Sequence, residues 1–110
     1  MTKIGAGGEP QKQPTVDEYK ASVDQNALKF MNALESYNLA NDPEQKAQLK
    51  AIMDQQLALI RSAVAEIKQA GIYKQDVKVE NDYKQFMSGG SPDAKTALET
   101  DLETLRDYMK

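Results

Sequence analysis

The chain has 110 residues and a formal net charge of −3, and 40% of its residues are hydrophobic while 28% are charged. It contains no cysteine and no histidine, which excludes disulfides, thiolate metal sites, a thiol nucleophile and the usual general base near neutral pH. The acidic balance provides no basic surface for phosphate groups, so we expect no nucleic acid among the partners.

We predict one helical domain over residues 15–110, because two halves of a chain this short would be too small for separate cores. Residues 1–14 are rich in glycine and proline and are predicted to form a disordered tail. No apolar run reaches the roughly 20 residues that span a bilayer, and no apolar segment of a signal peptide follows the first residues. A cytoplasmic location is therefore expected, while export without a cleaved leader stays open.

The first predicted helix spans about residues 15–40. Thr15 and Glu18 have the spacing of a capping box, in which each side chain accepts a hydrogen bond from the other residue's backbone N–H. Apolar residues then recur every three or four positions, which is typical of a helix with one buried face. This stripe consists of Val16, Tyr19, Val23, Ala27, Phe30, Leu34 and Tyr37, and Leu28 and Met31 widen it.

The second predicted helix spans about residues 43–70. Asp42 provides its cap, and Pro43 occupies the first helical position, where the missing N–H leaves no hydrogen bond unmade. Gly71 is expected to end the helix in a left-handed conformation. The connection to the first helix is so short that the two helices must form an antiparallel hairpin.

Two adjacent apolar seams on this second helix predict neighbours on two sides. One seam consists of Met53, Leu57, Ile60, Val64 and Ile67. The other consists of Leu49, Ile52, Leu59 and Ala63, and Gln56 interrupts it. So broad an apolar face is typical of the central helix of a small bundle.

Residues 71–75 are predicted to form a linker, followed by a shorter helix over about 77–88. Asp76 is expected to cap this helix, and Gly89 and Gly90 are expected to end it.

Ser91 and Pro92 begin a fourth predicted helix over about 92–109. Its apolar stripe consists of Ala94, Leu98, Leu102, Leu105 and Met109. Together the elements predict an all-α fold, in which an antiparallel helical hairpin is completed by one or two shorter helices into a three- or four-helix bundle.

The last helix also carries the densest group of acidic residues. Glu99, Glu103 and Asp107 follow one another at intervals of four and share one face, where like charges repel unless a cation or a basic partner lies between them. We interpret this face either as solvated surface or as a docking surface for a basic partner. The Glu-x-x-His pattern of di-metal bundles and the glycine-centred calcium loop are both missing, so no metal, cofactor, catalytic residue or small-molecule substrate is inferred.

The sequence therefore indicates a small non-enzymatic interaction module, such as an adaptor, a secretion-type chaperone or a subunit of a larger assembly. It would bind another protein, or a second copy of itself, through apolar helix faces. The alternative is a leaderless exported structural or effector protein whose hairpin assembles with itself or with a host component. The candidate partner-binding residues are Leu28, Met31, Leu49, Ile52, Leu59, Glu99 and Glu103.

Overall fold

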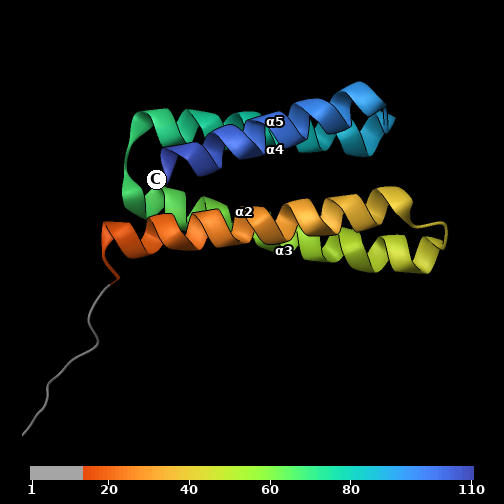
Figure 1. Cartoon of the computed structure of the whole chain (residues 1–110), viewed down its shortest axis with the longest axis horizontal. Helices are drawn as coiled ribbons and strands as arrows, with labels where there is room; N and C mark the ends of the chain where they lie inside the picture. The colour runs from red at the N-terminus through yellow and green to blue at the C-terminus, as the bar shows by residue number, and fades with distance from the viewer. Residues whose placement is uncertain (1–13) are drawn as a thin grey trace, which may run out of the picture.

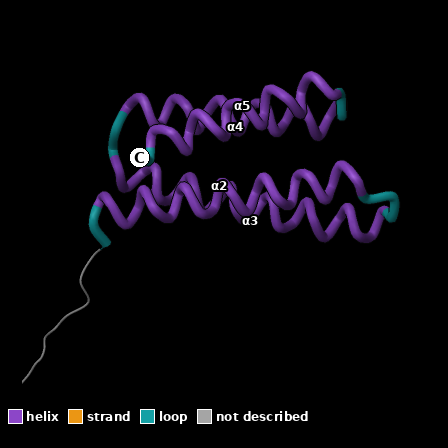
Figure 2. Tube along the Cα trace, in the orientation of Figure 1, coloured by secondary structure: helices purple, strands orange, loops and turns teal. Residues whose placement is uncertain are grey.

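The computed structural model describes residues 14–110, and all regular structure in this part of the chain is helical (Figure 1, Figure 2). The helices are α2 (Val16–Leu39), α3 (Pro43–Ile67), α4 (Ala70–Gly89) and α5 (Pro92–Tyr108). This confirms the predicted all-α fold, with a long hairpin completed by two shorter helices. The tail predicted over residues 1–14 lies outside the described residues, apart from Pro14.

The four helices form a ring in which each helix packs against two others. α2 packs against α3 and α5, and α4 packs against α3 and α5. Successive helices run in opposite directions, so neighbouring helices are antiparallel (Figure 1). α3 therefore has neighbours on two sides, as its broad apolar face predicted.

Side-chain caps fix three of the helix starts where the sequence places them. The Thr15 hydroxyl accepts from the Glu18 N–H at 3.2 Å, and the Glu18 carboxylate accepts from the Thr15 N–H at 2.8 Å. Asp42 accepts from the N–H of Glu44 at 3.1 Å, and Ser91 accepts from the N–H of Ala94 at the same distance. These bonds satisfy N–H groups that have no partner within the helix.

The junction between α3 and α4 differs from the prediction. α3 ends at Ile67, and Lys68 rather than Gly71 adopts the left-handed conformation, with φ 60° and ψ 39°. Gly71 lies inside α4, which begins at Ala70. The predicted linker over 71–75 is therefore helical, and the predicted start near residue 77 is wrong.

Burial of Ile72 explains the longer α4. Ile72, Val79 and Phe86 repeat every seven residues along one face of the helix, and all three are buried. Completing this face outweighs the roughly 1 kcal/mol that a glycine inside a helix costs. Asp76 falls within the same helix, so it is not the cap that the sequence predicted.

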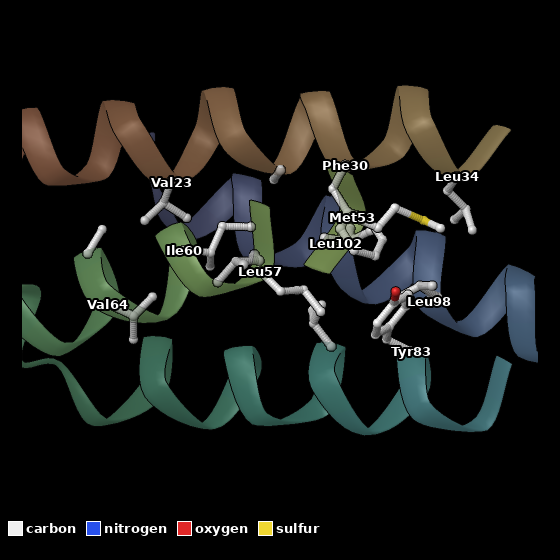
Figure 3. Close-up of a cluster of buried hydrophobic side chains, with 14 of the residues drawn as sticks. Val23, Phe30, Leu34, Met53, Leu57, Ile60, Val64, Tyr83, Leu98 and Leu102 are labelled. Carbon is white, nitrogen blue, oxygen red and sulfur yellow. The ribbon is translucent and has the colours of Figure 1, made fainter. Parts of the chain in front are cut away.

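Side chains from all four helices fill the interior of the ring. Figure 3 shows Val23, Phe30, Met53, Ile60, Tyr83 and Leu102 directed into this shared space. The Phe30 and Tyr83 rings meet edge to face across it, with centroids 5.3 Å apart. The first predicted seam of α3 and the leucines of α5 are buried here, so both hairpins contribute to one core.

The second predicted seam of α3 divides between the interior and the surface. Ala63 is buried and Leu49 packs partly against the core, whereas Ile52 and Leu59 are exposed. Gln56, which the sequence places as an interruption of this seam, is buried. The apolar face of α3 is therefore narrower on this side than its residue pattern suggests.

The left-handed conformation of Lys68 gives a direct test of the α3–α4 junction. A residue with a Cβ atom is disfavoured there by about 1 kcal/mol, and glycine is not. Glycine also gives the unfolded chain more conformational entropy, which offsets part of this gain. We therefore expect Lys68→Gly to raise the free energy of unfolding, measured in urea, by up to about 1 kcal/mol.

Lys74→Gly is the matched control for this variant, because Lys74 is an exposed lysine inside α4. It should lower the free energy of unfolding by about 1 kcal/mol. Equal destabilisation by the two glycine variants would show that α3 does not end at this left-handed residue.

Candidate protein-docking surface

A line of exposed residues runs along the whole outer side of α3. Its members alternate at intervals of three and four, which keeps them on one side of the helix. This α3 stripe consists of Gln45, Gln48, Ile52, Gln55, Leu59, Ser62 and Glu66, and every member is exposed. Ile52 and Leu59 are 42% and 44% exposed, and a single residue of the stripe is charged.

The hydrogen bonds of α3 show which way this stripe faces. Asp54 accepts from the Tyr83 hydroxyl of α4 at 2.6 Å, and Arg61 pairs with Glu80 of α4. Ile52 and Leu59 each precede one of these α3 residues by two positions, which is about 200° around a helix. The α3 stripe therefore faces away from α4.

The α3 stripe borders the contact between α3 and α2. Gln56 and Ala63, one turn beyond Ile52 and Leu59, are both buried on the side of α3 that faces away from α4. Since α3 packs against α2 and α4 in the described chain, α2 covers these two residues. Ile52 and Leu59 thus stand at the outer margin of the first hairpin.

α2 adds a second polar line beside this margin. Its members also alternate at intervals of three and four: Ser22, Gln25, Lys29, Asn32 and Ser36, all exposed apart from half-buried Ser22. Asp24 bonds Arg106 of α5, and Ser22 lies two positions before Asp24, which is about 200° around the helix. This line therefore faces away from α5. We call the α3 stripe and this α2 line together the charge-poor face, because Lys29 and Glu66 are its two charged residues.

Apart from Leu49 of α3, which packs partly against the core, the remaining candidate residues lie along the α2·α5 contact. Arg106 Nε donates to Asp24 at 2.8 Å, and Lys95 Nζ donates to Glu35 at 3.2 Å. Leu28, also 44% exposed, lies one turn after Asp24 on the same side of α2. Met31 is partly buried against the core.

The predicted acidic face is partly occupied by ion pairs within the chain. Glu99 accepts from Lys95 at 2.9 Å, and this bond raises the pKa of the Lys95 ammonium. Glu103 lies 3.6 Å from Arg106, whose pKa is raised chiefly by its bond to Asp24. The structure therefore does not bring the predicted partner-binding residues together. Ile52 and Leu59 lie on the α3 stripe, Leu28 lies on the α5 side of α2, and Leu49 and Met31 pack partly against the core.

A buried carboxyl group that sequence reasoning missed lies between α3 and α4. Asp76 is 1% exposed, and its Oδ1 has no hydrogen-bond partner among the described residues. Burial and, to a smaller extent, the neighbouring carboxyl group of Glu80 raise the pKa of Asp76 to about 7, although Arg61 opposes both effects. The signal was its spacing from Ile72 and Val79, which places Asp76 on the buried face of α4.

A shallow hollow of about 290 Å³ lies along the same α3·α4 contact. Four of its polar residues are paired with one another: Tyr83 donates to Asp54, and Arg61 Nε donates to Glu80 at 3.1 Å. Burial and the bond to Asp54 hold the pKa of the Tyr83 hydroxyl above its ordinary value, so the hydroxyl remains a donor. These pairs join the two hairpins.

Across residues 14–110 no group of three or more acidic side chains could hold a metal ion. Within the same residues no helix is long and apolar enough to cross a membrane. Comparison of the chain with protein-family models, with curated proteins and with solved structures gives no match in any of the three.

The raised pKa of Asp76 predicts a pH-dependent stability. The folded chain keeps a proton on Asp76 up to about pH 7, whereas the ordinary pKa is 3.8. The contribution of Asp76 to the free energy of unfolding is therefore greatest below about pH 4. It declines as the pH rises towards 7, because the Asp76 carboxyl group loses its proton at a lower pH in the unfolded chain than in the folded chain.

We expect Asp76→Asn to remove most of this decline and to raise the free energy of unfolding at pH 8 by about 2 kcal/mol. Urea unfolding followed by circular dichroism at pH 5 and pH 8 measures both effects. Glu66→Gln, which removes an exposed acid of α3, is the control for the loss of one acidic side chain. A wild-type chain that is more stable at pH 8 than at pH 5 would contradict the assignment.

Proposed function

We propose that this chain is a small non-enzymatic protein–protein interaction module whose docking surface is the charge-poor face of the first hairpin. The observation that supports this function is the pair Ile52 and Leu59, two large aliphatic side chains exposed by more than 40% on one stripe. Single exposed apolar residues are common on protein surfaces. A pair two turns apart on the same side of a helix, surrounded by uncharged side chains, is typical of a contact surface.

The composition of the face agrees with the anatomy of protein interfaces. Interface centres are depleted of charged residues, and polar groups surround an apolar middle. Here Gln48, Gln55 and Ser62 separate and flank the two aliphatic side chains. The seven-residue interval between Ile52 and Leu59 also matches the repeat with which one helix packs along another.

The energetics favour a reversible contact. Full burial of a leucine or isoleucine side chain contributes about 1.5–3 kcal/mol, and roughly half of each side chain is already covered in the free chain. Two such residues therefore give a modest apolar contribution. Amide and hydroxyl groups around them supply hydrogen bonds and specificity rather than a large share of the affinity.

The proposal places docking on the apolar stripe rather than on the acidic residues of α5. Glu99 and Glu103 each have a cationic neighbour within the chain, so a basic partner would gain less from them. The α3·α4 hollow is not part of the proposed docking surface, since Tyr83 bonds Asp54 and Arg61 bonds Glu80 across it. The module acts in the cytoplasm in this proposal, the location that the sequence predicts.

Site-specific photo-crosslinking in the cells that make the protein tests this function. A crosslinking amino acid replaces Gln55 in the centre of the face or, as the control, exposed Thr96 on α5. We expect a discrete protein adduct from position 55 and none from position 96. The adduct should disappear when Leu59→Lys is added to the position-55 chain, because a buried ammonium is costly. Equal labelling from both positions, or none from position 55, would refute the docking surface.

A further inference from the structure

We infer that the occupant of the charge-poor face is a second copy of this chain, held through the two α3 stripes packed in antiparallel orientation. This inference rests on the proposed function, because it names the partner for the same surface. A different protein on the face is one of the outcomes that the test separates.

The spacing of the α3 stripe is suited to a two-fold axis. Gln55 lies near its middle, with Ile52 three residues before it and Leu59 four residues after it. These offsets correspond to about 4.5 Å and 6 Å along a helix. A two-fold axis through Gln55 therefore brings Ile52 of each copy to nearly the same height as Leu59 of the other, and both aliphatic pairs are covered.

The chemistry of the face allows it to meet its own copy. A two-fold interface places the same patch against itself, so every group must be compatible with its neighbours from the same sequence. Amides and hydroxyls meet this condition, because each is both a donor and an acceptor. The members of the α3 stripe from Gln48 to Ser62 are all uncharged, so its centre places no like charges of α3 together, although the whole chain carries −3.

The surface of the second hairpin does not meet the same condition. The exposed residues of α4 include Lys74, Lys78 and Lys84, and those of α5 include Glu103 and Asp107. Pairing either helix with its own copy would bring like charges together, which opposes association. The uncharged centre of the α3 stripe avoids this electrostatic cost.

The size of the face predicts a reversible dimer. α3 has 25 residues, which corresponds to about 37 Å at ~1.5 Å per residue. With two helices about 9 Å apart, the face covers on the order of 600–700 Å². A stable interface buries roughly 800 Å² per partner, so we expect monomer and dimer to exchange with concentration.

Sedimentation equilibrium of the purified full chain measures this exchange. The average mass should rise from monomer towards dimer between about 1 µM and 1 mM. Leu59→Lys should raise the dissociation constant at least about 10-fold. Leu28→Lys is the matched control, because Leu28 and Leu59 are both 44% exposed and Leu28 lies on the α5 side of α2. It should change the constant by less than about two-fold.

A single cysteine gives a second readout that does not depend on a destabilising charge. The chain contains no cysteine, so Gln55→Cys introduces one thiol near the proposed axis, and Thr96→Cys introduces one on α5. Mild oxidation should link the position-55 chains into dimers and leave the position-96 chains largely unlinked. Circular dichroism confirms that each variant remains helical.

The outcomes separate this inference from the proposed function. A wild-type chain that stays monomeric up to 1 mM, or a dimer that Leu28→Lys weakens as much as Leu59→Lys, would overturn the two-copy assignment. If the position-55 adduct then contains a different protein, the docking function stands and the second copy is wrong. If position 55 gives neither an adduct nor a disulfide dimer, both proposals are wrong.

Discussion

The burial of three leucines on α5 is the constraint on which the rest of the molecule depends. Leu98, Leu102 and Leu105 are fully buried, although α5 is the last and shortest helix. Each buried leucine contributes roughly 2 kcal/mol, and a domain of this size has a net stability of only about 5–15 kcal/mol. The second hairpin must therefore close over the first for either to be stable. When the hairpins pack together, the inner faces of all four helices are buried and the outer face of α3 stays exposed.

Polar pairs at the two contacts between the hairpins set how they close. Asp54 with Tyr83 and Arg61 with Glu80 join α3 to α4. Asp24 with Arg106 and Glu35 with Lys95 join α2 to α5. In each contact the residue numbers increase along one helix while they decrease along the other, as antiparallel packing requires. Surface ion pairs add little stability, so their main effect is to fix the register.

The same contacts explain why α3 has a free side. α4 approaches α3 from the side of Asp54 and Arg61, and α2 covers Gln56 and Ala63. Ile52 and Leu59 lie just beyond the reach of α2. Asp76, in contrast, is a polar residue that becomes buried when the hairpins pack together. Its raised pKa reflects the free-energy cost of burying a charged carboxylate.

Local chemistry made much of the fold predictable from the sequence. The caps at Thr15, Asp42 and Ser91 depend on side chains and N–H groups a few residues apart, and all three are present. The prediction failed at Gly71, where burial of Ile72 overrode the local preference of glycine. It also missed Asp76, because Asp before a helical pattern is normally a cap.

The candidate surface was predictable only in part. A periodic pattern shows that a face is apolar, but it does not show which neighbour covers each edge. Of the predicted partner-binding residues, Ile52 and Leu59 are exposed on the α3 stripe, whereas Leu49 and Met31 pack against the core and Leu28 lies on a different surface. The positions of α4 and α5 decide between these cases, and those positions depend on contacts far apart in the sequence.

Nuclear magnetic resonance of a mixed sample shows whether the α3 stripe of the closed four-helix ring packs against another copy. Half of the chains carry ¹³C-labelled methyl groups and half are unlabelled, and the spectrum is filtered for contacts between copies. The account predicts contacts from Ile52 methyls of one copy to Leu59 methyls of the other. Contacts that instead involve the leucines of α5 would show that the hairpins open or exchange, and would contradict the closed four-helix ring.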